Sequence, residues 1–350
     1  KKFEKNLKNI LFLIKKVSYL INPECLIFLQ TTLPPGTTEH KIIPVIKKIF
    51  KKRQINKNPN IAYSYERAMP GKDYLNSVSN FWRVYSSSNS YAGSLCEKFL
   101  KTFINTNKFP LTKLKDITSC ETAKVLENTY RAVNIALVDE WTKFSQKLNL
   151  NLYDIIEAIR VRPTHNNLRY PGLGVGGYCL TKDPTFAEVS AKSIFKLKDL
   201  KFPISNLAIN INSKMPSFSF NWIEKITKNF KNKKTLLFGL SYKNDVGDLR
   251  FSPSIKLAKY LKKNKFKLNF FDPHVSQKEL KTVKKISKYD SLVNYKIFIF
   301  SVNHSTFIKN KIIKKIPKNS LLIDLVNFFE KKKYISEFKK KNITYRALGK

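Results

Sequence analysis

Glycine, cysteine, methionine and acidic side chains are all scarce in this chain of 350 residues. It holds 10 glycines, 4 cysteines and 2 methionines, and its 25 acidic residues are outnumbered by 66 basic ones. The cysteines form no C-x-x-C pair and no histidine cluster accompanies them, which argues against zinc or another bound metal. Their spacing indicates no disulfide framework, as is usual in a reducing cytoplasm. We therefore expect a cytoplasmic protein that binds no metal.

Long apolar runs are also missing. None reaches the ~20 residues that a membrane-spanning helix needs. The opening residues, KKFEKNLKNI, are charged and lead into an amphipathic pattern, unlike a signal peptide. We therefore expect no membrane partner. The chain begins without methionine and inside what reads as a helix, so we also expect that N-terminal residues are missing from it.

The shortage of acidic residues leaves a net charge of +41. All but nine of the 66 basic residues are lysines, and they are spread along the whole chain. Direct reading of bases favours arginine, whose planar fork binds bidentately. The favoured interpretation is a solvated basic surface, so we expect no nucleic-acid partner. A basic protein that binds a polyanion remains the alternative.

The hydrophobic and aromatic content indicates globular domains, because 42% of the residues are hydrophobic and 13% are aromatic. Helical spacing of apolar residues predicts a helix over 4–20, and the apolar run 25–32 predicts a buried parallel strand. Thr37 or Thr38 is the expected N-cap of a helix that continues to about Phe50. A strand over 60–64 completes a βαβ fragment.

The strongest helical pattern covers residues 121–148. One stripe of this helix is apolar and contains Leu126, Tyr130, Val133, Leu137, Trp141, Phe144 and Leu148. The opposite stripe is polar and contains Glu121, Lys124, Asn128 and Arg131. Periodicity alone leaves two interpretations of the polar stripe open, a face in solvent or a face that lines a cleft.

A second α/β unit begins after residue 234. Strands are expected over 235–240, 267–273, 296–302 and 320–326, and a helix over 252–264 with Ser252 as N-cap and Pro253 at its first position. This alternation predicts a second doubly wound domain. Its first turn, GLSYKNDVGD, lacks the G-x-G-x-x-G pattern, so we do not assign a dinucleotide to it.

Four of the ten glycines and one of the four cysteines fall in a single stretch, PGLGVGGYCLTKDP, residues 171–184. Glycine lets the backbone approach a ligand and adopt a positive φ. The stretch is either a structural turn beside an unreactive thiol or a pocket in which the thiol attacks a bound substrate. The residues alone do not choose between these two interpretations.

GLGVGGYCLTKD resembles the active-site loop of the UDP-glucose and UDP-N-acetylhexosamine 6-dehydrogenases. QTTLPPGTTEH, SYERAMPG, ETAKVLENTYRAVNIALVDE, LFGLSYKNDVGDLRFSP, FFDPHV and IDLVNFF resemble further segments of this family, in the same order. The resemblance implies an α/β fold with two Rossmann-like domains, the first incomplete, joined by a long central helix. It implies an NAD-binding part at 1–115, a central helical part for dimerisation and the active site at 116–230, and a UDP-sugar-binding part at 231–350.

The family oxidises the C6 alcohol of a UDP-sugar twice, with NAD as acceptor and a cysteine thioester as intermediate, often for polysaccharide synthesis. By resemblance, the catalytic residues are Cys179, Lys124, Asn128, Asp183, Glu66 and Thr32. The substrate-binding residues are Gly172, Gly174, Gly176, Gly177, Tyr170, Arg131, Tyr242 and Lys243. The residues that contact NAD are Thr32, Lys182 and Arg250. The resemblance also implies a homodimer formed through the central helix.

The chain departs from the family's pattern at Tyr178 and Lys182 in the cysteine loop, and at Tyr65 before Glu66. These departures leave the identity of the sugar open. Other interpretations also remain: Glu66 as a structural ion-pair partner of Arg67 or another arginine, the assigned cations as ordinary surface charges, and the chain as a catalytically incomplete fragment.

Overall fold

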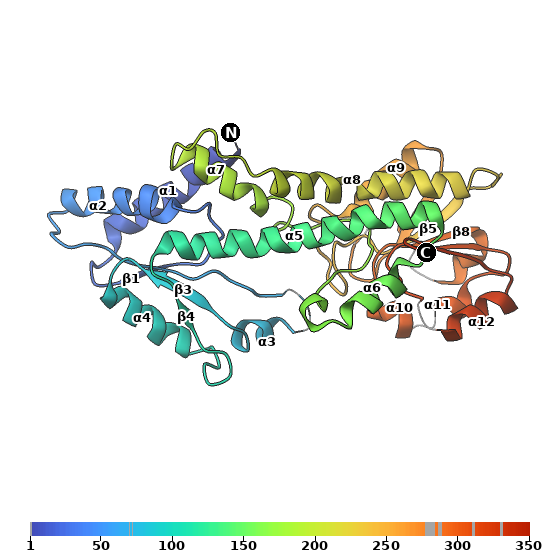
Figure 1. Cartoon of the computed structure of the whole chain (residues 1–350), viewed down its shortest axis with the longest axis horizontal. Coiled ribbons are helices and arrows are strands. Elements are labelled where there is room, and N and C mark those ends of the chain that lie inside the picture. The colour runs from blue at the N-terminus through green and yellow to red at the C-terminus, as the bar shows by residue number, and fades with distance from the viewer. Residues whose placement is uncertain are drawn as a thin grey trace. The chain divides into compact units, whose positions relative to one another are not determined.

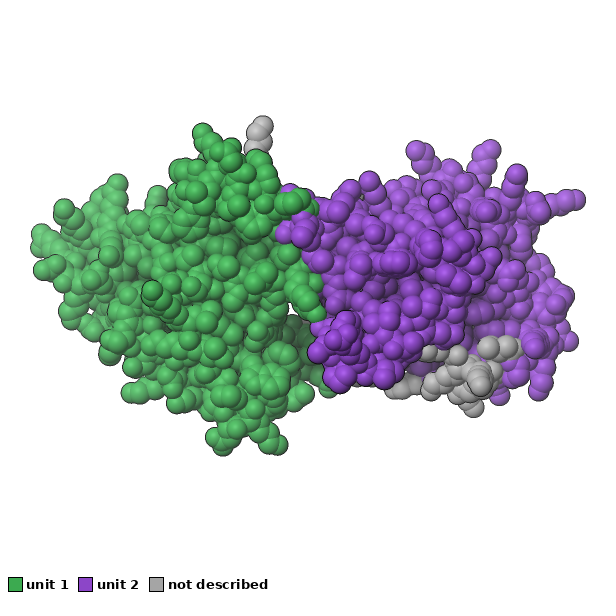
Figure 2. Space-filling model, in the orientation of Figure 1, with its two compact units in different colours: residues 1–130, 182–203 green, residues 131–181, 204–350 purple. Residues whose placement is uncertain are grey.

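The computed structural model describes residues 2–69, 71, 73–276, 284–285, 289–309, 312–329 and 332–350. It divides into two compact units (Figure 2): residues 1–130 with 182–203, called unit 1, and residues 131–181 with 204–350, called unit 2. Each is described by itself, and the three-part division expected from the sequence stays a prediction. Within the described residues, no helix combines the length and apolarity needed to cross a membrane.

Unit 1 is built on a four-stranded sheet (Figure 1) in the order β1-β2-β3-β4. The strands are β1 (Leu26–Leu29), β2 (Asn60–Tyr63), β3 (Val84–Ser87) and β4 (Thr112–Lys113). β1 pairs in parallel with β2 and β3 with β4, whereas β2 and β3 are antiparallel. The βαβ fragment expected from the sequence is confirmed.

Helices cover both faces of this sheet. The helices α1 (Lys2–Leu20) and α2 (Ile43–Lys52) cover one face and α4 (Ser90–Lys101) covers the other. Unit 1 also contains α3 (Tyr74–Ser79) and α7 (Phe186–Ser193). Ile61 and Tyr63 of β2 pack with Ile14 of α1 and Ile46 of α2, whereas Ala62 packs in the cluster of α4. Successive residues of one strand therefore point into two separate cores, as alternation along a strand requires.

The expected threonine N-cap before α2 is wrong. A short π-helix, Thr38–Ile42, precedes α2, and Thr37 itself has a helical backbone with φ −61° and caps no backbone N–H. Its hydroxyl donates to the carbonyl of Pro34 at 2.6 Å, and the hydroxyl of Thr38 donates to Glu121 at 2.6 Å. Both hydroxyls are therefore used elsewhere, and the chain enters the helix without a side-chain cap.

The long helix expected at 121–148 is α5 (Ile117–Leu148). Its apolar stripe does not form the core: Leu126 is 65% exposed, Leu137 50% and Trp141 51%. In the polar stripe, Glu121, Lys124 and Asn128 are buried instead, whereas Arg131 is exposed. Neighbouring helices are α6 (Leu152–Arg160) and α8 (Pro203–Ile226), with short 3-10 turns at Pro163–His165 and Asp183–Thr185.

Unit 2 contains a six-stranded parallel sheet in the order β10-β9-β8-β5-β6-β7. The strands are β5 (Lys234–Phe238), β6 (Lys267–Phe271), β7 (Lys284–Lys285), β8 (Ile297–Phe300), β9 (Leu321–Asp324) and β10 (Thr344–Ala347). The helices that follow them are α9 (Pro253–Lys263), α10 (Ser305–Lys309), α11 (Ile312–Lys315) and α12 (Lys332–Lys340), with a 3-10 turn at Tyr289–Asn294.

Both faces of this sheet are buried. Leu237 and Ile299 belong to one core, whereas the adjacent Phe238 and Phe300 belong to the other. The expected cap of α9 is present, because the Ser252 side chain accepts from two backbone N–H groups. The second doubly wound domain is thus confirmed. The chain leaves β5 on one side to form β6 and returns on the other side to form β8, and such a reversal creates a crevice at the carboxyl ends of the strands.

Candidate active site

Three of the four residues of the polar stripe of α5, Glu121, Lys124 and Asn128, lie buried in unit 1. Glu121 and Asn128 are 0% exposed and Lys124 is 6% exposed. Of the two interpretations left open by the sequence, the solvent face is therefore excluded for these three residues. Burying a cation, a carboxyl and an amide on one helix is costly unless each meets a partner, so their partners define the candidate site.

Lys124 is held at the segment that follows β2. Its Nζ donates to the main-chain carbonyl of Glu66 at 3.0 Å and lies 5.3 Å from the centre of the Tyr65 ring. The Glu66 carboxylate accepts from the backbone N–H groups of Arg67 and Ala68 at 2.7 and 2.9 Å. The Lys124 cation is therefore held on the backbone of this segment, and the Glu66 carboxylate is fixed by the N–H groups that follow it.

Arg83 is the residue that sequence reasoning missed. Its guanidinium, 2% exposed, donates to the second oxygen of Glu66 at 2.9 Å. Arg83 is therefore an ion-pair partner of Glu66. A role of Glu66 in hydrolysis of a thioester stays a prediction. The sequence held no signal for this contact, because it depends on the antiparallel pairing of β2 and β3, which brings the residue before β3 beside the residues that follow β2.

Asn128 and Asp183 form the second buried pair. The Nδ2 of Asn128 donates to Oδ2 of Asp183 at 2.8 Å, and Asp183 is fully buried. Lys182 forms an ion pair with the other oxygen of Asp183 and lies 4.5 Å from the centre of the Phe186 ring. The Oδ1 of Asn128 is buried with no hydrogen-bond partner among the described residues. A buried acceptor without a donor is rare and calls for a ligand or water.

Glu121 is the third buried residue of the polar stripe, and a place for Thr32 in the site stays a prediction. Oε1 of Glu121 accepts from the backbone N–H of Thr38 at 3.1 Å and from its hydroxyl at 2.6 Å. Burial raises the pKa of Glu121 to about 7, although these hydrogen bonds oppose the shift. Thr32 is half-buried and follows β1, as expected from the sequence.

The glycine loop belongs to unit 2 and packs against its own chain. Gly174 has φ +99°, and a Cβ there would lie 2.5 Å from the carbonyl oxygen of Asn212. Gly177 has φ +78°, and its Cβ would lie 2.8 Å from the Tyr242 ring. A Cβ on Gly176 would lie 2.5 Å from Cβ of Tyr242. These three glycines are therefore needed for close contact within the protein, and a role in wrapping the sugar stays a prediction.

Gly172 differs, because a Cβ there would meet nothing within 4 Å. The stretch 172–177 reads literally as G-x-G-x-x-G. The structure nevertheless places it in a loop between two 3-10 turns, Pro163–His165 and Asp183–Thr185. A dinucleotide fingerprint joins a strand to a helix, so this stretch is not one.

Cys179 is exposed and lies at the end of the glycine loop. Burial and the neighbouring Asp248 raise the pKa of Tyr242, and Cys179 lies close enough to this phenol to act on it electrostatically. The loop is tied to the segment before α9, because the backbone N–H of Gly177 donates to the carbonyl of Arg250 at 2.9 Å. This arrangement leaves the sulfur accessible while fixing the backbone that carries it.

Arg250 and Tyr178 stack at this junction. The guanidinium lies 5.3 Å from the centre of the Tyr178 ring, and that ring packs edge-on against Phe251. Both carboxylate oxygens of Asp248 accept from Nε of Arg250 at 2.9 Å. Arg250 is thus held in one orientation while its side chain remains 61% exposed.

The other assigned substrate residues are spread over unit 2. Tyr170 hydrogen-bonds with Glu157 and Arg160 and stacks on Tyr153. Arg131 is exposed on α5, and Lys243 is half-buried in the loop after β5. The structure does not gather these three into one described cluster.

The predicted site residues fall into two groups, one in each unit. Glu66, Lys124, Asn128 and Asp183, with Lys182, are gathered in unit 1. The glycine loop, Cys179, Tyr242 and Arg250 are gathered in unit 2. The resemblance assigns Cys179, Lys124 and Asn128 to one active site. Cys179 belongs to unit 2 and the other two to unit 1, so this shared site stays a prediction.

Known proteins share both the sequence and the domains of this chain. Residues 118–214 match the central domain of the UDP-glucose/GDP-mannose dehydrogenase family, and residues 236–331 match its UDP binding domain. A UDP-N-acetyl-D-mannosamine dehydrogenase of Methanococcus aeolicus is 34% identical over 312 residues, which are 86% of this chain and 65% of that protein. One of Methanococcus vannielii is 32% identical over 330 residues, 92% of this chain and 71% of that protein.

The fold agrees with the sequence similarity. A solved structure of a UDP-D-ManNAc dehydrogenase from Pyrococcus horikoshii has a TM-score of 0.81 and 26% identity, over 98% of this chain and 77% of that one. The chain spans 65% of the length of the M. aeolicus relative and 71% of the M. vannielii one. From the matching domains, these identities and the shared fold, we conclude that the chain belongs to the UDP-glucose/GDP-mannose dehydrogenase family.

Proposed function

We propose that the protein oxidises the C6 alcohol of a UDP-sugar to the carboxylate, with NAD as hydride acceptor. The observation that carries the proposal is the buried part of the polar stripe of α5. It holds a cation, Lys124, and an amide, Asn128, whose carbonyl oxygen lacks a donor. Such a pair can contact an oxygen that gains negative charge and a hydroxyl that donates a proton, which is what this oxidation presents.

The reaction needs a nucleophile, and we assign this role to Cys179. Its thiol adds to the aldehyde formed by the first oxidation, the adduct loses a second hydride to give a thioester, and water hydrolyses the thioester. One alcohol and one water thus yield a carboxylate and two hydrides, with protons released to solvent. An exposed sulfur at the end of a fixed loop is suited to this addition.

Unit 1 supplies the remaining groups in this proposal. Lys124 stabilises the oxyanion of the adduct, and Asn128 orients water or the C6 oxygen. Asp183 takes or returns a proton, and Glu66 and Thr32 position the hydrolytic water. The hydrogen bond of Asn128 to Asp183 supports the assignment, because it fixes the amide with its acceptor facing away from the carboxylate.

Substrate and acceptor are assigned by the same resemblance. The glycine loop with Tyr170, Arg131, Tyr242 and Lys243 would bind the UDP-sugar. NAD supplies a hydride acceptor when bound, and Thr32, Lys182 and Arg250 are the residues assigned to it. No G-x-G-x-x-G turn joins a strand to a helix within the described part of the chain, so these residues would contact the cofactor without forming that pyrophosphate cradle.

The sugar most worth testing is an acetamido sugar. The similar proteins of M. aeolicus and M. vannielii are named UDP-N-acetyl-D-mannosamine dehydrogenases, and one of Salmonella typhi is named a UDP-N-acetyl-D-glucosamine 6-dehydrogenase. We propose UDP-N-acetyl-D-mannosamine as the substrate and polysaccharide synthesis as the use of its product.

The test is NADH formation with a panel of UDP-sugars, using the protein with any residues that precede this chain in its gene. We expect two NADH per sugar consumed and a uronic acid product. One NADH per sugar would contradict the thioester route. No turnover of any UDP-sugar, together with steeply salt-dependent binding to a polyanion, would favour the alternative of a basic binding protein.

We also propose that the protein is a homodimer. In unit 2, residues of α5 and α6 line an apolar groove of about 350 Å³ that includes Leu137, Trp141, Phe144, Ile155 and Ile159. The three residues from α5 are 50–51% exposed and the two from α6 are 40–41% exposed. Exposed aromatic and aliphatic groups gathered in this way mark an interaction surface, and the resemblance implies that a second copy covers it.

A further inference from the structure

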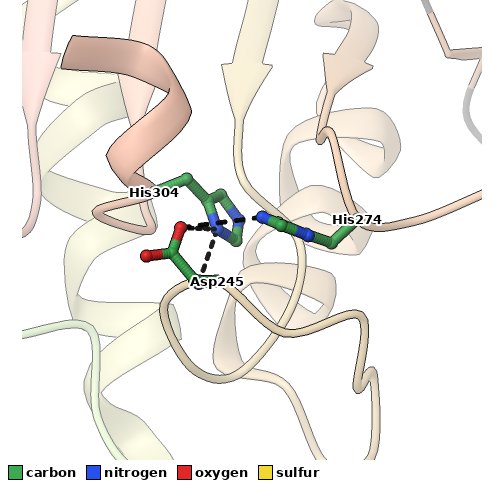
Figure 3. Close-up of side chains that lie close together, drawn as sticks. All are labelled: Asp245, His274 and His304. Carbon is green, nitrogen blue, oxygen red and sulfur yellow. Dashed lines mark hydrogen bonds and ion pairs between the residues drawn. The ribbon is translucent and has the colours of Figure 1, made fainter. Parts of the chain in front are cut away.

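Three loops of unit 2 meet at one edge of its sheet. They follow β8, β5 and β6, which are neighbours in the sheet and run parallel, so their carboxyl ends lie together. His304 comes from the loop after β8, Asp245 from the loop after β5 and His274 from the loop after β6. Figure 3 shows the three side chains converging at this point. It is the reversal point of the strand order, where open α/β sheets bind ligands.

We propose that Asp245, His274 and His304 form a binding site for a divalent transition-metal ion of the Zn²⁺ type. One ligand atom from each residue lies within 4.8 Å of the other two. Oδ1 of Asp245 is 3.6 Å from Nε2 of His274 and 3.8 Å from Nδ1 of His304. Ligand atoms around tetrahedral zinc are about 3.3 Å apart, given bonds of about 2.0–2.1 Å, so small side-chain movements bring the three into range.

The tautomer of His304 suits a metal ligand. Its Nε2 lies 3.2 Å from Oδ2 of Asp272, which can only accept, so Nε2 carries the proton and Nδ1 presents its lone pair to the cluster. A carboxylate behind a histidine is the usual second partner of a metal-binding imidazole.

One contact must change when the ion binds. Nδ1 of His304 accepts the backbone N–H of Asp245 at 2.9 Å, and this lone pair cannot serve both groups. Asp245 has a left-handed backbone with φ +55°, and its Oδ1 accepts from the N–H and hydroxyl of Ser305. A small rotation of the peptide before Asp245 would free Nδ1 while the carboxylate keeps its place at the start of α10.

Two imidazoles and one carboxylate favour Zn²⁺, Co²⁺ or Ni²⁺ over Mg²⁺ or Ca²⁺, which prefer oxygen ligands. Three protein ligands leave a position for water or for an anionic ligand. The ion would also connect three loops, one of which carries Lys243. The histidines lie 30 residues apart in the chain, outside any metal-binding spacing, which is why the sequence alone predicted no metal.

Co²⁺ titration of the untagged, metal-free protein tests the site, because Co²⁺ bound to histidine and carboxylate absorbs visible light. The background is Cys25→Ala with Cys179→Ala, which removes both exposed thiols as competing ligands. The ligand variant is His274→Ala, whose side chain is 32% exposed, so that truncation leaves the core intact. The matched control is His165→Ala, an exposed histidine elsewhere in unit 2.

We expect visible bands that saturate at one Co²⁺ per chain, a rise in melting temperature with added metal, and loss of both with excess chelator. His274→Ala should weaken Co²⁺ binding about tenfold or more. Asp245→Asn should also weaken it, and His165→Ala should leave it unchanged. Absence of bands and of a melting-temperature rise in the background protein overturns the proposal. So does unchanged Co²⁺ affinity in a folded His274→Ala variant.

Discussion

Asn128 donates a 2.8 Å hydrogen bond to Asp183, 55 positions further along the chain, and both side chains are fully buried. The pair fixes the amide so that its oxygen, which has no donor among the described residues, faces away from the carboxylate. Lys124 lies one helical turn before Asn128 and donates to the carbonyl of Glu66.

Lys124→Ala should lower kcat by ~10²–10³-fold with little change in KM, because a buried cation matters most where negative charge develops. Steady-state kinetics with the best UDP-sugar give the two constants. Lys147→Ala, an exposed lysine on the same helix, is the control and should behave as wild type. A rise in KM at unchanged kcat would assign Lys124 to substrate binding instead.

Cys179→Ala should abolish acid formation while UDP-sugar binding stays nearly unchanged, since the thiol forms the adduct and does not hold the nucleotide. Cys179→Ser should accumulate an ester, because an alkoxide leaves far less readily than a thiolate. Intact-protein mass spectrometry after a single turnover detects this adduct. Cys25→Ala, the other exposed cysteine, should retain full activity. Normal acid formation by Cys179→Ala would refute the thioester route.

Stability should depend on pH through Glu121. Burial raises its pKa from the ordinary 4.5 to about 7, so between these values the folded chain binds more protons than the unfolded chain. The free energy of unfolding should therefore fall as pH rises from about 4.5 to 7, by on the order of 3 kcal/mol, and level off above.

The variant Glu121→Gln removes this dependence. In urea titrations at several pH values, its stability relative to wild type should increase from pH 4.5 to 7. Glu140→Gln, on the exposed side of the same helix, should show no such trend. If the difference in unfolding free energy between wild type and Glu121→Gln stays constant across this pH range, the buried carboxyl of Glu121 is not the source of the pH dependence.

Gly174→Ala should destabilise unit 2 by about 1–3 kcal/mol, because φ is +99° and the new Cβ would lie 2.5 Å from the carbonyl of Asn212. Gly172→Ala is the matched control, since its Cβ meets nothing within 4 Å; its effect should stay within about 0.5 kcal/mol. Urea-unfolding midpoints compare the two. Equal effects would mean that close packing is not why Gly174 is glycine.

Trp141→Glu should convert the proposed homodimer to monomer, because it places a charge in the apolar groove of α5 and α6. Sedimentation velocity measures the change. Val161→Glu is the control: Val161 is 82% exposed but does not line the groove, so the dimer should persist. A wild-type protein that sediments as a monomer would exclude the dimer outright.

The sequence by itself predicted secondary-structure elements and the fold class, because local interactions along the chain specify them. Strands β1, β2, β5, β6, β8 and β9 and the capped helix α9 formed as expected, because apolar runs and the Ser252-Pro253 start are local signals. The shorter or edge strands β3, β4, β7 and β10 were not predicted. The motif order likewise identified the family. The N-cap at Thr37 or Thr38 failed because Glu121, distant in sequence, competes for the Thr38 hydroxyl.

Only the tertiary structure decided which side of α5 is buried. Periodicity showed an apolar and a polar stripe, and a local rule would bury the apolar one. Three of the four residues of the polar stripe are buried instead, because Thr38, Glu66 and Asp183 supply hydrogen-bond partners from three separate segments. The proximity of Asp245, His274 and His304 could not be predicted from the sequence either, because it depends on β8, β5 and β6 being neighbours in the sheet. Strand order is set by packing over the whole unit, which no short stretch of sequence contains.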